Sequence, residues 1–144
     1  SATYSSHYRR EDSSPCDFFP YVLPVLEQLR NDNHVLTVAT GKSRAGLDRV
    51  LQATDLQSLF HGSRCADETA SKPNPLMLEQ LLDQFEMRPE QAVMVGDTEF
   101  DMEMAVNANM PRIAVSYGAH EASRLRSYGP IACVDCFSEI VSYI

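Results

Sequence analysis

The sequence predicts an α/β fold in which a mostly parallel sheet is covered by helices. Short apolar, β-branched segments alternate with segments whose apolar residues recur at helical spacing. The strand candidates at 34–39, 92–95 and 112–116 are largely apolar, as is typical of strands buried on both faces. A chain of 144 residues is long enough to form one such domain.

The N-terminal stretch differs from the rest of the chain. Serines, charged residues and one proline dominate residues 1–19, which we interpret as the end of a helix followed by a linker. Regular patterning begins at Pro20, where we expect a helix that ends near Asn31. Residues 20–144 are therefore expected to form the core domain.

Caps, breakers and apolar spacing predict the later elements. Ser43 is expected to cap a helix with Leu47 and Leu51 on its inner face. Two prolines make 71–75 a rigid turn that precedes another helix. The other expected elements are a weak strand at 61–65, a helix at 99–109, a helix near 121–127, a short strand at 131–134 and a final helix at 136–144.

Charge and composition argue against several classes of function. The formal net charge of −8, without Lys and Arg clusters, argues against binding to nucleic acid or to an anionic membrane. No apolar run approaches the ~20 residues that span a bilayer. The cysteines lack the second pair or the histidines of a zinc site, so we expect them to be reduced in a cytoplasmic protein. They are Cys16, Cys65, Cys133 and Cys136.

Polar residues follow two of the expected elements. Because ligands bind beyond the carboxyl ends of parallel strands, these residues are candidates for a site. Thr40 and Gly41 end the strand at 34–39, and a hydroxyl and a backbone N–H there can hold phosphate oxygens; an ordinary Thr-Gly turn is the alternative. Lys72 lies in the turn at 71–75, where it is either a solvated lysine or a positive charge that faces a phosphoryl group.

The most specific pattern follows the strand at 92–95. Gly96 allows a sharp turn, and Asp97 and Asp101 are four residues apart at the start of a helix, so their carboxylates lie close together. Two converging carboxylates suit Mg²⁺, which prefers oxygen ligands. The alternative is that Asp97 or Thr98 caps the helix and that Asp101 adds favourable charge to its first turn.

In order and spacing, these residues resemble motifs two, three and four of the haloacid dehalogenase (HAD) superfamily. The resemblance runs from Phe19 to the C-terminus and implies a Rossmann-like, three-layer parallel sheet. The segments 71–75 and 95–98 look like the phosphoglycolate-phosphatase-like branch. The segment 18–22 resembles the return of the chain from a cap domain in that branch, which assigns residues 1–19 to a cap remnant and its return linker.

The resemblance implies Mg²⁺-dependent hydrolysis of a small phosphorylated metabolite through an aspartyl-phosphate. By motif matching, Thr40 and the Gly41 amide bind the phosphoryl group, and Lys72 contacts it and orients the nucleophile. Asp97 ligates Mg²⁺, and Asp101 does so directly or through water. Weaker candidates for shaping the site are Tyr117, Gly118 and His120, in a loop at the same sheet edge, and a surface loop is the preferred interpretation of His120.

One departure from the family pattern is large. The family carries its nucleophile in Asp-x-Asp-x-Thr or Val after the first core strand, and no Asp-x-Asp occurs in this sequence. We therefore expect a fragment whose core is incomplete at the N-terminal side and which is inactive alone. An open central strand edge predicts self-association. A non-catalytic HAD-like binding or regulatory module, or a phosphomutase of the same fold, stays open.

Overall fold

The computed structural model describes residues 2–5, 18–116 and 122–144. These residues form one parallel, six-stranded sheet in the order β3-β2-β1-β4-β5-β6. Its strands are β1 (Ala2–Ser5), β2 (Leu36–Thr40), β3 (Gly62–Cys65), β4 (Met94–Gly96), β5 (Arg112–Val115) and β6 (Ala132–Val134). The α-helices are α1 (Phe18–Asn31), α2 (Arg44–Thr54), α3 (Leu76–Gln84), α4 (Glu99–Asn107) and α5 (Ala122–Arg126).

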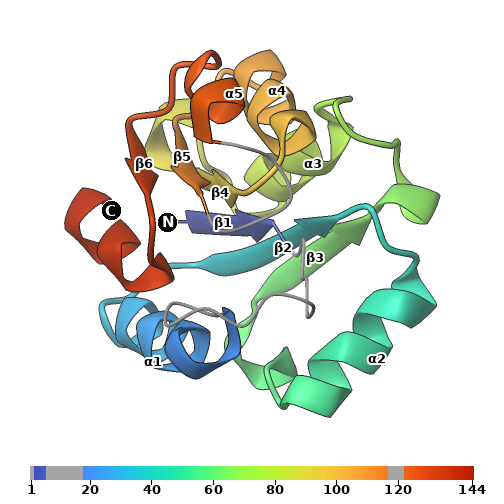
Figure 1. The fold of residues 1–144 in the computed structure, drawn as a ribbon. Helices are drawn as coiled ribbons and strands as arrows, with labels where there is room; N and C mark the ends of the chain where they lie inside the picture. The colour runs from blue at the N-terminus through green and yellow to red at the C-terminus, as the bar shows by residue number, and fades with distance from the viewer. Residues whose placement is uncertain (1, 6–17, 117–121) are drawn as a thin grey trace.

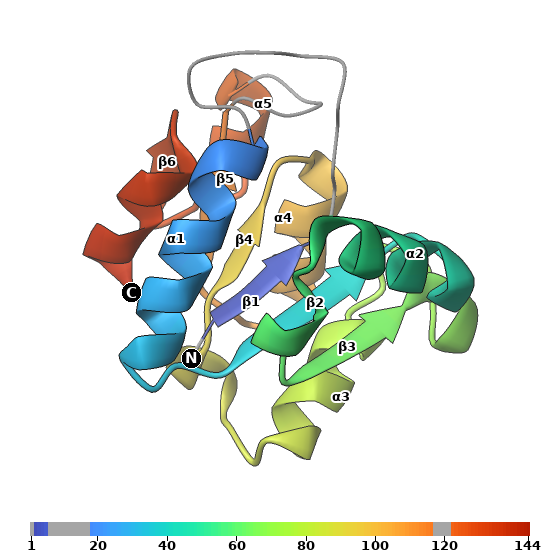
Figure 2. The same ribbon diagram turned by 90° about the horizontal axis from the view of Figure 1, so that it is seen from below.

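Helices cover both faces of this sheet, as predicted (Figure 1). α1 and α2 lie on one face, with the C-terminal 3-10 helix η4 (Phe137–Tyr143) beside α1, and α3, α4 and α5 lie on the other. Figure 2 shows α1 on the β5 side of that face and α2 on the β3 side. The Rossmann-like, three-layer α/β architecture is confirmed, although the last helix is of the 3-10 type along its length.

Two apolar clusters hold the layers together. Successive side chains of a strand point to opposite faces, so β4 contributes to both clusters. Val95 packs on the side of α1 and η4, whereas its neighbour Met94 packs against α3 and α4. This burial on both faces is the physical reason that the strand at 92–95 is apolar at every position. Complete burial of a side chain such as Met94 contributes about 1.5–3 kcal/mol.

The N-terminal segment differs from our expectation. Ala2–Ser5 form β1, a parallel strand that pairs with both β2 and β4, at the position that we expected to be open. Two unpaired strand edges offer backbone groups to any short extended segment, and Thr3 and Tyr4 are good strand formers. The described sheet is therefore continuous, with β3 and β6 at its edges. The expected linker also ends earlier than residue 19, because α1 begins at Phe18. Residues 1 and 6–17 lie outside the described residues, and self-association stays a prediction.

The cysteines require a second correction. Cys136 is disulfide-bonded, whereas Cys65 and Cys133 are free, so the prediction of reduced cysteines is wrong for Cys136. A disulfide depends on how close two side chains come in the fold, which the Cys-x-x-Cys spacing does not report. Burial raises the pKa of the Cys65 thiol and makes it an inert core residue. In the described ranges, no helix is both long and apolar enough to cross a membrane.

Candidate active site

The predicted site residues meet at the carboxyl edge of the sheet. β2 ends at Thr40 and β4 ends at Gly96, and these two strands flank β1. Lys72 reaches the same edge from the turn before α3, where its Nζ binds Oδ1 of Asp101. The fold therefore brings three separate sequence segments together around the carboxyl end of β1.

The pair of Lys72 and Asp101 is buried. Their side chains are 7% and 0% exposed. The second carboxylate oxygen of Asp101 accepts hydrogen bonds from the backbone N–H of Asp97 at 3.2 Å and of Thr98 at 3.3 Å. A buried charge is tolerated only when it is paired and hydrogen-bonded, and both oxygens of Asp101 meet that condition.

Asp101 also belongs to a capping box at the start of α4. Thr98 Oγ1 accepts from the backbone N–H of Asp101 at 3.1 Å, and Asp101 accepts from the N–H of Thr98. The capping interpretation is thus correct for Thr98. Helix capping needs neither an ammonium group nor a second carboxylate, so it explains neither Lys72 nor Asp97, which is only 5% exposed at the same turn.

Gly96 is required by the close approach of Asp101. A Cβ atom at Gly96 would lie 2.4 Å from Cβ of Asp101 and 2.7 Å from its Oδ2. Such distances are far inside van der Waals contact. The absence of a side chain at this position therefore allows the Asp101 carboxylate to reach back under the end of β4.

The Lys72 turn is held from two sides. Its Lys72–Pro73 peptide bond is cis. Oδ1 of Asn74 accepts from the first backbone N–H of α3 at 2.9 Å, and Nδ2 of Asn107 donates to the carbonyl of Pro73 at 3.1 Å. Asn107 ties the turn to the end of α4, so it helps to hold Lys72 in place. Nothing in the sequence pointed to Asn107, because the contact spans 34 positions.

The Thr40 loop is more open. Thr40 is fully buried, and its Oγ1 accepts from the backbone N–H of Lys42 at 3.1 Å. Gly41 is exposed, and a Cβ atom there would meet no heavy atom within 4 Å. The backbone at Gly41 is therefore accessible, which suits the predicted contact with a phosphate oxygen.

A second ion pair links two loops at this edge. The guanidinium of Arg44 binds Glu68 through two hydrogen bonds of 2.8 and 3.1 Å, and its backbone N–H donates to the carboxylate of Asp67. The contact ties the start of α2 to the loop that leads from β3 to Lys72. The hydrogen bond between the side chains is the main cause that raises the pKa of Arg44 and lowers that of Glu68. The pair spans 24 positions, so no local spacing rule could have revealed it.

The donor set fits a hard divalent cation. Asp97 offers a nearly buried carboxylate at the strand exit, and carboxylate oxygens are the ligands that Mg²⁺ prefers. Both oxygens of Asp101 accept hydrogen bonds. Each carboxylate oxygen has two lone pairs, so these bonds are compatible with either direct contact to a metal or contact through water.

The remaining predicted positions are not tested by the structure. Tyr117, Gly118 and His120 lie outside the described residues, although β5 ends two residues before Tyr117 at the same edge. β1 ends at Ser5, and the sequence continues with Ser6 and His7 rather than with a carboxylate. The Asp-x-Asp that the family pattern places after its first core strand does not follow β1 in this sequence.

Comparison with known proteins identifies the family of this chain. A model of the haloacid dehalogenase-like hydrolases matches residues 1–115. The chain belongs to this family. It is 34% identical over 141 residues to the probable phosphatase IndB of Dickeya dadantii, which covers 96% of the chain and 61% of that protein. It is 27% identical over 143 residues to pyrophosphatase PpaX of Oceanobacillus iheyensis, with coverages of 99% and 67%.

Solved structures show the same fold. A predicted phosphoglycolate phosphatase from Haemophilus somnus superposes with a TM-score of 0.81 at 25% identity, covering 87% of this chain and 56% of that one. The HAD chain thus spans only part of the length of the proteins that it matches: 61% and 67% of the two relatives and 56% of the structure.

Proposed function

We propose that this chain carries the phosphate-binding and magnesium-binding part of a HAD phosphatase that hydrolyses phosphate monoesters through an aspartyl-phosphate. The observation that carries the proposal is the buried pair of Lys72 and Asp101 beside Asp97, at the edge where Thr40 ends β2. A merely structural turn gains little from a buried ion pair, because the desolvation cost of two charges offsets most of their attraction.

Each residue has a role in this proposal. Thr40 and the Gly41 amide bind oxygens of the phosphoryl group, and Lys72 balances its charge while Asp101 holds the ammonium in position. Asp97 ligates Mg²⁺, with Asp101 in contact directly or through water. Bound Mg²⁺ would neutralise the charge on the transferring group.

The nucleophile is the part that this sequence lacks. In the proposed reaction an aspartate at the carboxyl end of the first core strand attacks phosphorus, which divides one difficult displacement into two easier steps. No Asp-x-Asp occurs in the chain. We therefore propose that the chain alone binds but does not hydrolyse its substrate. The same absence is the observation that favours the second candidate, a non-catalytic HAD-like module that holds a phosphorylated ligand.

The proposed partner is a small phosphorylated metabolite, not nucleic acid or a membrane. The relatives support this class, since they are named as a phosphatase and a pyrophosphatase, and the structural neighbour as a phosphoglycolate phosphatase. We propose a phosphoglycolate-phosphatase-like activity for the complete enzyme and a cytoplasmic location.

The experiment is to incubate the chain with p-nitrophenyl phosphate and Mg²⁺ and to measure, in parallel, the binding of inorganic phosphate by calorimetry. We expect Mg²⁺-dependent phosphate binding without hydrolysis. Asp97→Asn should abolish the binding, whereas Asp83→Asn, the same change at an exposed position on α3, should preserve it. Hydrolysis that Asp97→Asn removes would show that the chain contains its own nucleophile. A chain that binds no phosphate would overturn the proposal.

A further inference from the structure

We propose that Asn107 is a positioning residue that acts through Lys72. Its hydrogen bond to the turn at 71–75 sets where the Lys72 ammonium group stands, and thereby how tightly the site binds a phosphoryl group. This inference rests on the proposed function, because it takes Lys72 as the cation that faces that group.

Helix α4 contacts the Lys72 turn at two points. Near the start of the helix, the carboxylate of Asp101 binds Nζ of Lys72. At its last residue, Nδ2 of Asn107 donates to the carbonyl oxygen of Pro73 at 3.1 Å. Six residues separate Asp101 from Asn107, which is roughly 9 Å along a helix. One rigid element therefore holds both the tip of the lysine side chain and the backbone next to its origin.

The turn itself is only partly supported by packing. Ser71 and Asn74 are exposed, and Pro73 is half-buried. The backbone N–H of Asn74 donates to the carbonyl of Ser71 at 3.0 Å, and Oδ1 of Asn74 accepts from the first N–H of α3. These bonds close the turn and join it to α3. The bond from Asn107 adds a direct tie between the backbone of the turn and α4.

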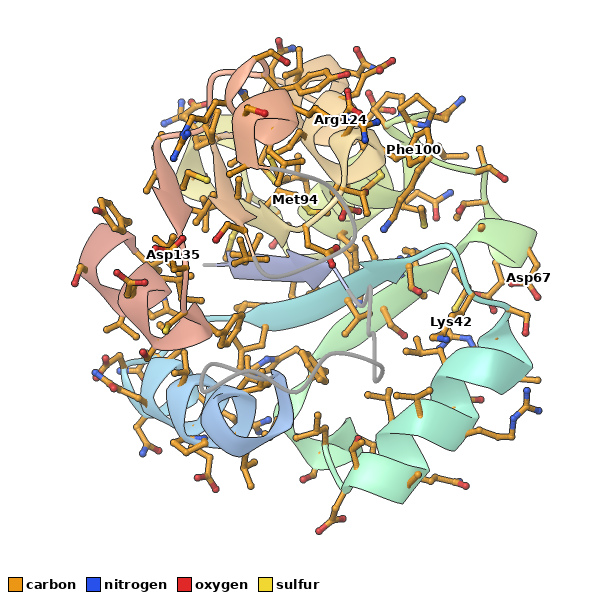
Figure 3. The ribbon with its side chains drawn as sticks, in the orientation of Figure 1. Lys42, Asp67, Met94, Phe100, Arg124 and Asp135 are labelled. Carbon is orange, nitrogen blue, oxygen red and sulfur yellow. The ribbon has the colours of Figure 1, made fainter. Side chains whose placement is uncertain are left out.

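The two helices beside the turn form a rigid support. Met77 and Leu78 of α3 are fully buried in one apolar cluster with Met104 and Ala105 of α4. Figure 3 shows Met94 of β4, which belongs to the same cluster. Protein interiors are close-packed and yield little. A displacement of Lys72 is therefore expected to come from the turn and not from the helices.

The end of α4 does not need the Asn107 side chain. The backbone N–H of Ala108 donates to the carbonyl of Met104 at 3.0 Å, and Asn109 adopts the left-handed conformation, with φ of 58°, that commonly ends a helix. Asn is also a weaker helix former than Ala or Leu. Neither helix capping nor helix propensity accounts for the amide of Asn107, whereas the contact with Pro73 does.

The effect of Asn107 should be larger on phosphate binding than on folding. Asn107 is exposed, so its neutral hydrogen bond adds little to stability. The contact of Lys72 with a phosphate oxygen is a charge-assisted hydrogen bond, and its strength depends on distance and angle. A small shift of the ammonium group would therefore weaken binding while the fold persists.

The test removes the N–H donor and keeps the size of the side chain. In Asn107→Asp, binding of inorganic phosphate to the whole chain with Mg²⁺ is measured by calorimetry, and stability by urea unfolding. We expect the affinity to fall about tenfold, the value of one charge-assisted hydrogen bond. Asn109→Asp is the matched control, because it places the same charge at an exposed position two residues farther along. It should bind phosphate as the unchanged chain does, and the two variants should have similar urea midpoints.

A second measurement needs no phosphate. The sequence has two lysines, of which Lys72 is only 7% exposed and Lys42 is half-buried. Figure 3 shows Lys42 at the start of the loop from β2 to α2, whereas α4 lies on the other face of the sheet. Peptide mass spectrometry after treatment with an amine-acetylating reagent gives the rate for each lysine in one molecule. Asn107→Asp should raise the rate at Lys72 severalfold relative to Lys42, and Asn109→Asp should not.

The outcomes separate this inference from the proposed function. Equal phosphate affinity in Asn107→Asp and Asn109→Asp would overturn the inference alone. A loss of affinity that matches a loss of stability in urea would also overturn it, because Asn107 would then act on the fold as a whole. If the unchanged chain binds no phosphate, the proposed function fails, and the ratio of acetylation rates alone decides whether Asn107 positions Lys72.

Discussion

Two ion pairs lie at the carboxyl edge of the sheet, and their surroundings differ. The side chains of Lys72 and Asp101 are 7% and 0% exposed, whereas those of Arg44 and Glu68 are 35% and 41% exposed. Both pairs join loops that are far apart in the sequence. Water screens the outer pair and is excluded from the inner one, so similar chemistry should have different consequences for stability.

The largest effect is expected when the inner pair is broken. Asp101→Asn removes the charge that balances buried Lys72, and breaking a buried pair from one side costs about 3–5 kcal/mol of the free energy of unfolding. Urea unfolding of the two proteins measures this cost. The matched change in the outer pair, Glu68→Gln, should cost less than about 1 kcal/mol. Similar costs for the two variants would show that exposure does not distinguish these pairs.

A smaller loss of stability is expected from a substitution at Gly96, whose missing side chain makes room for Asp101 of the inner pair. In Gly96→Ala the new methyl group would overlap Asp101, so the carboxylate or β4 must shift. Overpacking of this kind costs about 1–3 kcal/mol, and Mg²⁺ binding should weaken with it. Gly41→Ala is the control, because its methyl group would enter open space. An unchanged urea midpoint in Gly96→Ala would contradict the close approach.

The outer pair, Arg44 and Glu68, should contribute to the loss of folding stability at acid pH. Its hydrogen bond lowers the pKa of Glu68 below the ordinary 4.5, so the pair stabilises the fold above pH 4.5. That contribution is lost as the pH falls through the lowered pKa, because Glu68 becomes protonated. Urea unfolding between pH 3 and 6 should show a shallower loss in Glu68→Gln than in the unchanged chain, and added salt should reduce the difference. If the stabilities of the two proteins fall in parallel with pH, the pair does not contribute to the acid loss of stability.

The smallest effect on stability is expected from His34, which lies before β2 at the edge of the sheet opposite the candidate site. It serves as a reference for groups outside that site. Burial lowers the pKa of His34 from the ordinary 6.5, and Asp32 partly opposes this shift. The unfolded chain then binds the proton more readily, so stability should fall slightly as the pH drops below 6.5. Thermal unfolding at pH 7.5 and 5.5 should reveal this slope, and His34→Gln should flatten it. If the pH dependence of stability persists in His34→Gln, groups other than His34 cause it.

The strand exits could be predicted because they are local. Thr40 and Asp97 each lie within a residue of a buried strand, and the sequence pattern marks where such strands end. The contact between Lys72 and Asp101 spans 29 positions, and only the resemblance to a family suggested that these residues act together. Their placement at one edge then follows from parallel topology.

The features that escaped prediction are those that depend on tertiary contacts. The pairing of Ala2–Ser5 with β2 and β4 depends on two open edges that exist only once the sheet has formed. The bond between Arg44 and Glu68 and the disulfide of Cys136 likewise depend on distances across the fold. Local composition carries no signal for such contacts.

The central claim is that the carboxyl edge is a magnesium-dependent phosphate site organised around Asp97. Calorimetric titration of the chain with Mg²⁺, in the presence of inorganic phosphate, tests it most directly. We predict binding at one site that Asp97→Asn eliminates and that Asp83→Asn preserves. Binding of equal strength in Asp97→Asn, or no binding in the unchanged chain, would contradict the claim.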